Sequence, residues 1–151
     1  MMSKYYLLLS IAATVGVSSS VSAQRPTDNA KVWPVGEMKW EKDKTLPAVQ
    51  SVLLWGDPAS GDHGMLRKFP AGYAPPMHRH PSVERVVVIS GTMVVDYSGG
   101  QTKTLGPGSY SEIPANTDHA VQCGKEADCV FLLSSSGPFA IVPSDGGKHQ
   151  H

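Results

Sequence analysis

Short apolar runs separated by turn residues make up most of this chain. Several runs alternate between apolar and polar positions, as strands with one buried face do. Segments such as GDPASGD, SGG, GPG, PANTD and SSGP divide them, and no window has the spacing of a long amphipathic helix. We therefore predict an all-β fold, a sandwich or a barrel. The predicted strands cover residues 38–41, 49–55, 63–69, 74–80, 83–90, 92–97, 101–105, 109–113, 119–123, 129–134 and 139–142.

The first 23 residues have a different pattern. Lys4 precedes an apolar run over residues 5–17, and small residues lead to Val21-Ser22-Ala23, which is the pattern of a cleaved secretory signal. The run is shorter than the roughly 20 residues that cross a bilayer, so we do not expect a membrane anchor. We predict a signal peptide over 1–23, a loose arm over 24–37, one domain over 38–143 and a disordered tail over 144–151. The mature protein is expected in the periplasm or outside the cell.

The charge of the chain is balanced, with 13 Lys and Arg against 13 Asp and Glu among 151 residues. This balance gives no basis for a nucleic-acid partner, nor for a membrane partner after removal of the signal.

Two cysteines, Cys123 and Cys129, flank the polar loop GKEAD between two apolar runs. We interpret these runs as a hairpin, which brings the two cysteines opposite each other. An exported protein meets oxidising conditions, so we predict a Cys123–Cys129 disulfide. Two separate buried thiols, or a soft metal site, are the alternatives; no further cysteine is present to complete such a site.

The segment GYAPPMHRHPSVERVVVISG places ionisable groups inside an apolar run. Side chains of a strand alternate between its faces, so His78 and His80 point the same way. If the strand that follows Pro81 and Ser82 is an antiparallel neighbour, Glu84 lies beside the two imidazoles. Two histidines and a carboxylate on one face suit a divalent transition metal, whose charge compensates the buried carboxylate.

A second segment, GPGSYSEIPANTDHAVQC, ends a turn at His119 and then continues as an apolar strand. This histidine can supply a fourth ligand from another part of the sheet. Other histidines are weaker candidates: we expect His63 to be a solvated surface residue, and His149 and His151 lie in the tail. Trp33, Trp40 and Trp55 are interpreted as core or interface residues.

Together the two segments resemble the two motifs of the cupin superfamily. The first motif is Gly, five residues, His-x-His, three or four residues, Glu, six residues, Gly, and this chain fills it with Gly72, His78, His80, Glu84 and Gly91. The second is Gly, five residues, Pro-x-Gly, two residues, His, three residues, Asn. The chain fills it with Gly108, Pro114 and His119, but has Asn116 and Cys123 in place of the second glycine and the final asparagine. Asparagine tolerates the left-handed backbone that this glycine provides.

The resemblance implies a small exported single-domain cupin, a conical β-barrel with jelly-roll topology. It implies one divalent transition metal per subunit, held by His78, His80, Glu84 and His119, with Fe, Cu or Mn favoured over Ni or Zn. In the family such centres run dioxygenases, oxidases, decarboxylases, isomerases and lyases, so the resemblance does not choose the reaction. Because export fits copper or iron redox chemistry, our leading hypothesis is a metal-dependent oxidoreductase that uses dioxygen or peroxide on a small organic or sugar-like substrate, including oxidative cleavage of polysaccharide. The alternatives are a lyase, isomerase or decarboxylase, and a non-catalytic module that binds a small molecule or carbohydrate. A homodimer is expected by analogy with other single-barrel cupins.

Overall fold

The computed structural model describes residues 30–99 and 101–144. The chain divides into two units, Met1–Trp33 and Pro34–His151. Only residues 30–33 of the first unit are described, and they form neither helix nor strand. The predicted signal peptide, the arm up to residue 29 and the tail from residue 145 lie outside the described residues. The fold below belongs to the second unit, which opens with one turn of 3-10 helix, η1 (Val35–Glu37).

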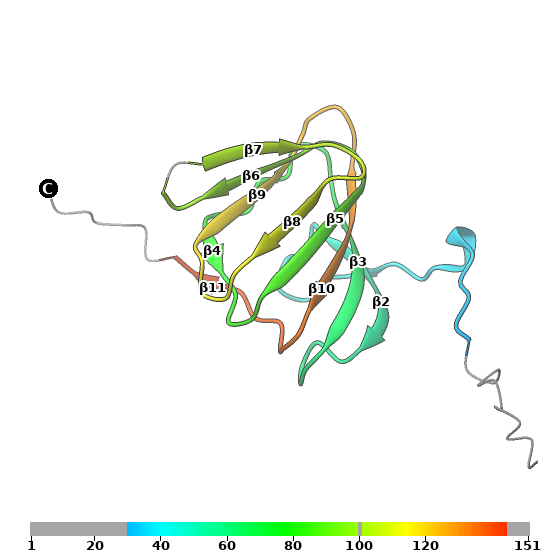
Figure 1. The fold of residues 1–151 in the computed structure, drawn as a ribbon. Helices are drawn as coiled ribbons and strands as arrows, with labels where there is room; N and C mark the ends of the chain where they lie inside the picture. The colour runs from blue at the N-terminus through cyan, green and yellow to red at the C-terminus, as the bar shows by residue number, and fades with distance from the viewer. Residues whose placement is uncertain (1–29, 100, 145–151) are drawn as a thin grey trace, which may run out of the picture. The chain divides into compact units, whose positions relative to one another are not determined.

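The second unit consists of two antiparallel sheets (Figure 1). The large sheet has the order β1-β2-β3-β10-β5-β8 and the small sheet the order β11-β4-β9-β6-β7. This arrangement confirms the all-β prediction, although no backbone pairing among the described strands closes the two sheets into one continuous barrel. The strands are β1 (Glu41–Lys42), β2 (Gln50–Gly56), β3 (His63–Phe69), β4 (His78–Arg79), β5 (Glu84–Ser90), β6 (Met93–Tyr97), β7 (Gln101–Leu105), β8 (Tyr110–Ile113), β9 (His119–Cys123), β10 (Cys129–Ser135) and β11 (Val142–Pro143).

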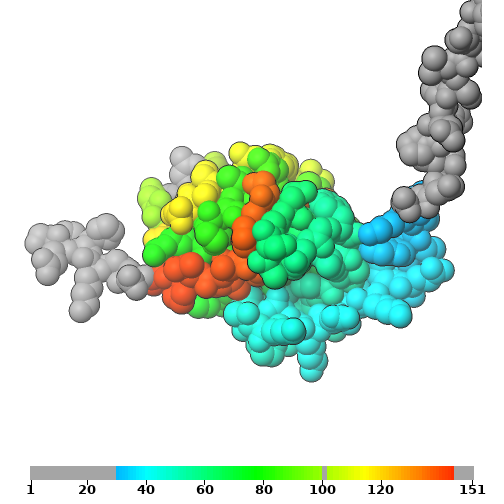
Figure 2. Space-filling model, turned by 90° about the horizontal axis from the view of Figure 1, so that it is seen from below, coloured from blue at the N-terminus to red at the C-terminus, as the bar shows by residue number. Residues whose placement is uncertain are grey.

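Most predicted strands agree with these bounds to within a residue or two, but the predictions for 38–41, 74–80 and 139–142 are wrong in extent. Only β1, β4 and β11, of two residues each, form there. Pro75 and Pro76 lack the N–H that a ladder needs, which limits β4. The N–H of Phe139 donates to the Pro58 carbonyl at 2.8 Å, so the predicted strand over 139–142 begins with a bond to a turn, and strand pairing starts only at Val142. In the view from below, the orange to red chain after β10 lies beside the blue-green β2–β3 region (Figure 2).

The core lies between the sheets and follows the period-two pattern. On β5, Glu84, Val86 and Val88 are buried while the residues between them are exposed. Met93 and Val95 of the small sheet face them, at 1% and 2% exposure. The apolar interior therefore surrounds the one carboxylate of β5.

A disulfide joins Cys123 at the end of β9 to Cys129 at the start of β10, with Cα atoms 5.7 Å apart. The predicted bridge is confirmed, but the predicted hairpin is wrong. β9 pairs with β4 and β6 in the small sheet, whereas β10 pairs with β3 and β5 in the large sheet. The loop GKEAD crosses from one sheet to the other, and the disulfide ties the two sheets together at that end.

Four motif positions have left-handed backbone, namely Gly72, Gly91, Gly108 and Asn116. Gly91 ends the first motif with φ of 77°, and a Cβ there would lie 2.6 Å from the Asp128 carbonyl oxygen. Asn116 has φ of 60°, which confirms that it takes the conformation of the glycine it replaces. Separately, none of the described residues belongs to a helix long and apolar enough to cross a membrane.

Candidate metal centre

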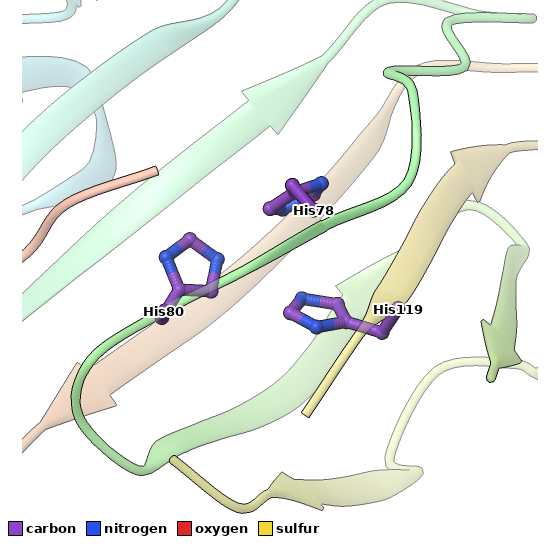
Figure 3. A group of neighbouring side chains, drawn as sticks. All are labelled: His78, His80 and His119. Atoms are coloured by element: carbon purple, nitrogen blue, oxygen red, sulfur yellow. The ribbon is translucent and has the colours of Figure 1, made fainter. Parts of the chain in front are cut away.

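Three histidines meet on the inner face of the small sheet. His78 opens β4 and lies directly opposite His119 of β9, and His80 follows two residues after His78 on the same face. The three side chains are between 1% and 8% exposed. Figure 3 shows the three imidazole rings turned toward a common space. One ligand atom from each of the three rings lies within 4.8 Å of the others.

Backbone carbonyls set the orientation of each ring. Nδ1 lies 2.8 Å from the Pro76 oxygen in His78, 2.7 Å from the Ala140 oxygen in His80 and 2.9 Å from the Thr117 oxygen in His119. A carbonyl only accepts, so each Nδ1 carries the proton and donates it. Each Nε2 therefore keeps a free lone pair, which is the form of imidazole that ligates metals.

Burial also keeps the imidazoles of His80 and His119 neutral. Loss of solvation lowers the pKa of His80 to about 3, although the hydrogen bond to Ala140 opposes the shift. Burial lowers the pKa of His119 as well, against the opposing effect of its bond to Thr117. Neutral imidazoles do not repel a cation, so His80 and His119 can bind a metal ion without first losing a proton.

Glu84 approaches this group from the opposite sheet. It is 3% exposed on β5, and its Oε2 lies 3.3 Å from Nε2 of His80. The predicted proximity is therefore present, but the predicted strand pairing is wrong: β4 and β5 belong to different sheets, and the turn at Pro81 and Ser82 carries the chain between them. Glu84 does not share the mutual 4.8 Å spacing of the three histidines.

The carboxyl of Glu84 is held in an apolar setting. Burial raises its pKa to about 8, and the charge of Arg67 only partly offsets this. Its Oε1 has no hydrogen-bond partner among the described residues. An orphaned buried carboxyl oxygen beside three imidazole lone pairs fits a divalent transition metal, which would supply both the charge and the missing bond. Glu84 as the fourth ligand remains a prediction.

A cavity of about 30 Å³ adjoins the histidines between the sheets. This volume holds roughly two water-sized groups. Its walls are mainly apolar, and its charged or ionisable lining residues are the three histidines, Glu84 and Arg67. The site can therefore enclose a metal ion and a very small group, but not a bulky one.

Arg67 is the residue that the sequence analysis missed. It is 3% exposed, and its Nη2 donates to Oδ2 of Asp43 at 2.6 Å. Its guanidinium carbon stands 5.0 Å from the ring centroid of Phe139, which in turn stacks on His80 at 5.2 Å. The signal was present: Arg67 alternates with Met65 and Phe69 in HGMLRKF, so the period-two rule places all three on the inner face.

The prediction for His63 is wrong. It is fully buried at 0% exposure, with Nδ1 2.9 Å from the Gly61 oxygen and its ring edge-on to Phe139. It opens β3 on the inward face, so the alternation that buries Arg67 also buries this histidine. Trp33 and Trp55 are 41% and 40% exposed, so neither is a core residue. His149 and His151 lie outside the described residues.

Comparisons with known proteins agree with this fold. A family model described as a domain of unknown function, DUF4437, matches residues 19–142. No curated protein sequence matches the chain.

Solved structures give the same result. The polyketide cyclase RemF from Streptomyces resistomycificus matches with a TM-score of 0.67 at 19% identity, over 80% of this chain and 89% of that one. An RmlC-like cupin from Ralstonia eutropha JMP134 matches with a TM-score of 0.63 at 21% identity, over 77% and 74% of the two chains. The DMSP lyase DddQ from Ruegeria pomeroyi DSS-3 matches with a TM-score of 0.61 at 20% identity, over 72% of this chain, which spans 62% of that lyase. These likenesses confirm the predicted cupin fold, and at such identities they establish the fold alone.

Proposed function

The chain belongs to the DUF4437 family of cupin-like proteins, and we propose that it is a metal-dependent enzyme acting on a small organic molecule. The observation that carries the proposal is the convergence of three buried imidazoles, each with Nδ1 bound to a carbonyl and Nε2 unprotonated, beside a small cavity. A purely structural ion is usually surrounded completely by protein ligands. Here the histidines border open space, which leaves room for a substrate group.

Different residues would have different roles in this centre. His78, His80 and His119 would hold the ion, and Glu84 would balance its charge from the other sheet. A divalent transition metal with open positions supplies Lewis-acid or redox chemistry to a molecule beside it. The apolar lining, which includes Val86, Met93 and Phe131, excludes bulk water from that molecule.

Oxidoreductase chemistry with dioxygen or peroxide is the first candidate reaction. An imidazole-rich set with a carboxylate suits Fe, Cu or Mn, with Ni or Zn as alternatives. The small cavity accommodates one very small group, such as a diatomic molecule, beside the ion. It favours a small molecule over a polysaccharide chain, which has no space between the sheets.

A lyase, isomerase or decarboxylase is the second candidate, and the position of Glu84 favours it. Glu84 contacts His80 but lies outside the mutual spacing of the histidine group, so its carboxyl is placed to accept or donate a proton beside the centre. The likeness of fold to a protein described as a DMSP lyase is compatible with this reading. A non-catalytic module that binds a small molecule or carbohydrate is the third.

One experiment separates these classes. The protein loaded with Fe(II), Cu(II), Mn(II), Ni(II) or Zn(II) is incubated with a panel of small organic acids, sugars and aromatics, with and without dioxygen, and the products are identified by mass spectrometry. Turnover that needs dioxygen and a redox-active ion supports the oxidoreductase. Turnover without dioxygen supports the lyase class, and binding without any product under all conditions contradicts an enzymatic role.

Export and dimer formation are parts of the same proposal. The Cys123–Cys129 disulfide supports an oxidising compartment, periplasmic or extracellular. The exposed apolar residues Val87, Ile89 and Tyr110 lie on the outer face of β5 and β8 and support a homodimer through that face. Cell fractionation tests the first point, and the mass in solution of the wild type and of Val87→Glu tests the second.

A further inference from the structure

We propose that Arg67 binds a carboxylate group of the substrate, so that the substrate is a small monocarboxylate. This inference rests on the proposed function, since it places the reacting molecule in the cavity beside the histidines. Burial of the Arg67 guanidinium is costly for the fold. A charged side chain is almost never fully buried without compensation, and Arg67 is 97% buried in the large sheet, with one face toward the cavity.

Arg67 uses little of its hydrogen-bonding capacity. A guanidinium has five N–H donors, and the described residues provide one side-chain acceptor, Oδ2 of Asp43. The buried Nε has no partner among the described residues. The hydroxyl of Ser51, which lies opposite Arg67 on β2, is a second buried polar group without a partner there. Two adjacent orphaned groups indicate that a polar ligand binds between the sheets at this point.

Asp43 fixes the direction of the guanidinium. Its Oδ1 accepts hydrogen bonds from the backbone N–H groups of Thr45 and Leu46, at 2.8 and 2.9 Å, while Oδ2 accepts from Arg67. Its own N–H donates to the Val49 carbonyl at 2.9 Å. Asp43 is thus anchored by its own loop and acts as a positioning residue for Arg67. The flat face of Arg67 rests near Phe139, so an edge of the guanidinium is left for a ligand.

A planar fork of N–H groups matches a carboxylate, and charge favours a single negative charge. Asp43 takes up one N–H of this fork, so one further carboxylate, with a single negative charge, completes its pairing. The cavity of about 30 Å³ accommodates a carboxylate more readily than the larger tetrahedral phosphate.

The remainder of the substrate has a place outside the cavity. A groove of about 320 Å³ is bounded by the loop of Asp43 and by Phe139, and Leu53 and Met65 supply apolar surface to it. Asp43 and Phe139 both contact Arg67, so the groove adjoins the buried guanidinium. Glu41, Lys42 and Lys44 also line the groove, so it offers both apolar and charged surface to the remainder of a small carboxylic acid.

The test uses acetate, propionate and pyruvate as probes, with acetamide and propionamide as neutral counterparts, and measures binding by calorimetry. Metal-free and zinc-loaded protein are titrated in parallel, and zinc content is measured separately. Wild type is expected to bind at least one acid in both forms and to bind the amides far more weakly. Arg67→Gln is expected to weaken binding of the acid by about 10- to 100-fold, the loss typical of a charge-assisted hydrogen bond, without a change in zinc content.

Arg85→Gln is the matched control, because Arg85 is exposed and pairs with Glu112 outside the site. Arg67→Lys keeps the buried charge and replaces Arg67→Gln if that variant does not fold; it too is expected to weaken binding, since lysine lacks the planar fork. The inference is overturned if acid and amide bind wild type equally, if no acid binds, or if the Arg67 variants bind the acid as wild type does. Failure to take up zinc contradicts the proposed function instead, because acid binding is read independently in the metal-free form.

Discussion

His78 and His119 occupy directly opposite positions on β4 and β9, with ring centroids 4.6 Å apart. One belongs to the first sequence motif and the other to the second. β4 is only two residues long, so this single pair joins the two motifs within the small sheet. The centre therefore depends on the carbonyls and rings that hold His78 and His80 in place as much as on the pairing of β4.

Phe139 is expected to support the metal centre without ligating it. It stacks on His80, and the next residue, Ala140, accepts the Nδ1 proton of that histidine. Phe139→Ala removes the ring that stacks on His80 and loosens the segment that carries the Ala140 carbonyl. Zinc affinity should therefore fall by about 10-fold or more, the loss typical of changes to residues that support metal ligands. Competition titration with a chromophoric chelator measures it. Tyr110→Ala, on the outer face, is the control and should leave the affinity unchanged; equal affinities of wild type and Phe139→Ala would disprove the supporting role.

Glu84 should make the metal-free protein less stable as the pH rises. Its folded pKa of about 8 exceeds the ordinary 4.5, so the stability it contributes is complete below pH 4.5 and is lost up to about pH 8. His80 and His119, whose pKa values are lowered by burial, act in the opposite direction, mainly below the ordinary histidine pKa of 6.5, so the effect of Glu84 dominates above it. The free energy of unfolding should fall by about 1–2 kcal/mol between pH 6.5 and 8.

Urea titrations of metal-free protein at several pH values measure this fall. Glu84→Gln cannot ionise and should show a flat profile over the same range. A wild-type profile as flat as that of the variant would contradict the high pKa of Glu84.

The disulfide should stabilise the fold by about 2 kcal/mol, because it closes a short loop between the sheets. Reduction should lower the urea midpoint of the wild type to that of the Cys123→Ser/Cys129→Ser double variant. The double variant itself should not respond to the reductant. If reduction leaves the wild-type midpoint in place, the bridge contributes nothing to stability.

Two of the left-handed motif positions, Gly91 and Asn116, should respond differently to substitution. Gly91→Ala places a methyl group 2.6 Å from the Asp128 carbonyl oxygen on a backbone with φ of 77°, so a loss of more than about 2 kcal/mol is expected. Asn116→Gly replaces one tolerated residue with another on an exposed turn and should change stability by less than about 0.5 kcal/mol. Thermal unfolding of both variants checks the contrast; comparable losses would show that the tolerance argued for Asn116 is incorrect.

Local pattern was sufficient for the strands and for the gathering of the histidines. Period-two alternation predicted that His78 and His80 share a face, and the spacing of the two motifs brought in His119. The local pattern does not predict which strands pair with each other. The runs around Cys123 and Cys129 resemble a hairpin whether the loop turns back or crosses to the other sheet, and Glu84 reaches His80 in either arrangement.

The sequence analysis also failed to predict which charged and polar residues are buried. In the sequence Arg67 stands beside another cation and His63 follows a turn, and polar residues in such places are usually exposed. Their burial follows from the inward phase of β3, which places them on the same face as Met65 and Phe69. The alternation of β3 in the sequence predicts which of its residues face inward. The ion pair that compensates the charge of Arg67 is different, because its partner Asp43 lies in a loop 24 residues earlier in the chain. That contact is set by the tertiary fold.

Metal stoichiometry tests the central claim most directly. Metal-free protein with His149 and His151 replaced by Ala, which removes adventitious sites in the tail, is incubated in turn with Fe(II), Mn(II), Cu(II) and Zn(II), desalted, and measured by mass spectrometry for metal per chain. We predict one ion per chain in this background and in His63→Gln, a buried histidine outside the centre, and none above background after His119→Ala or His78→Ala. Uptake of no ion by the parent protein, or equal uptake by His119→Ala, would contradict a metal centre built on these histidines.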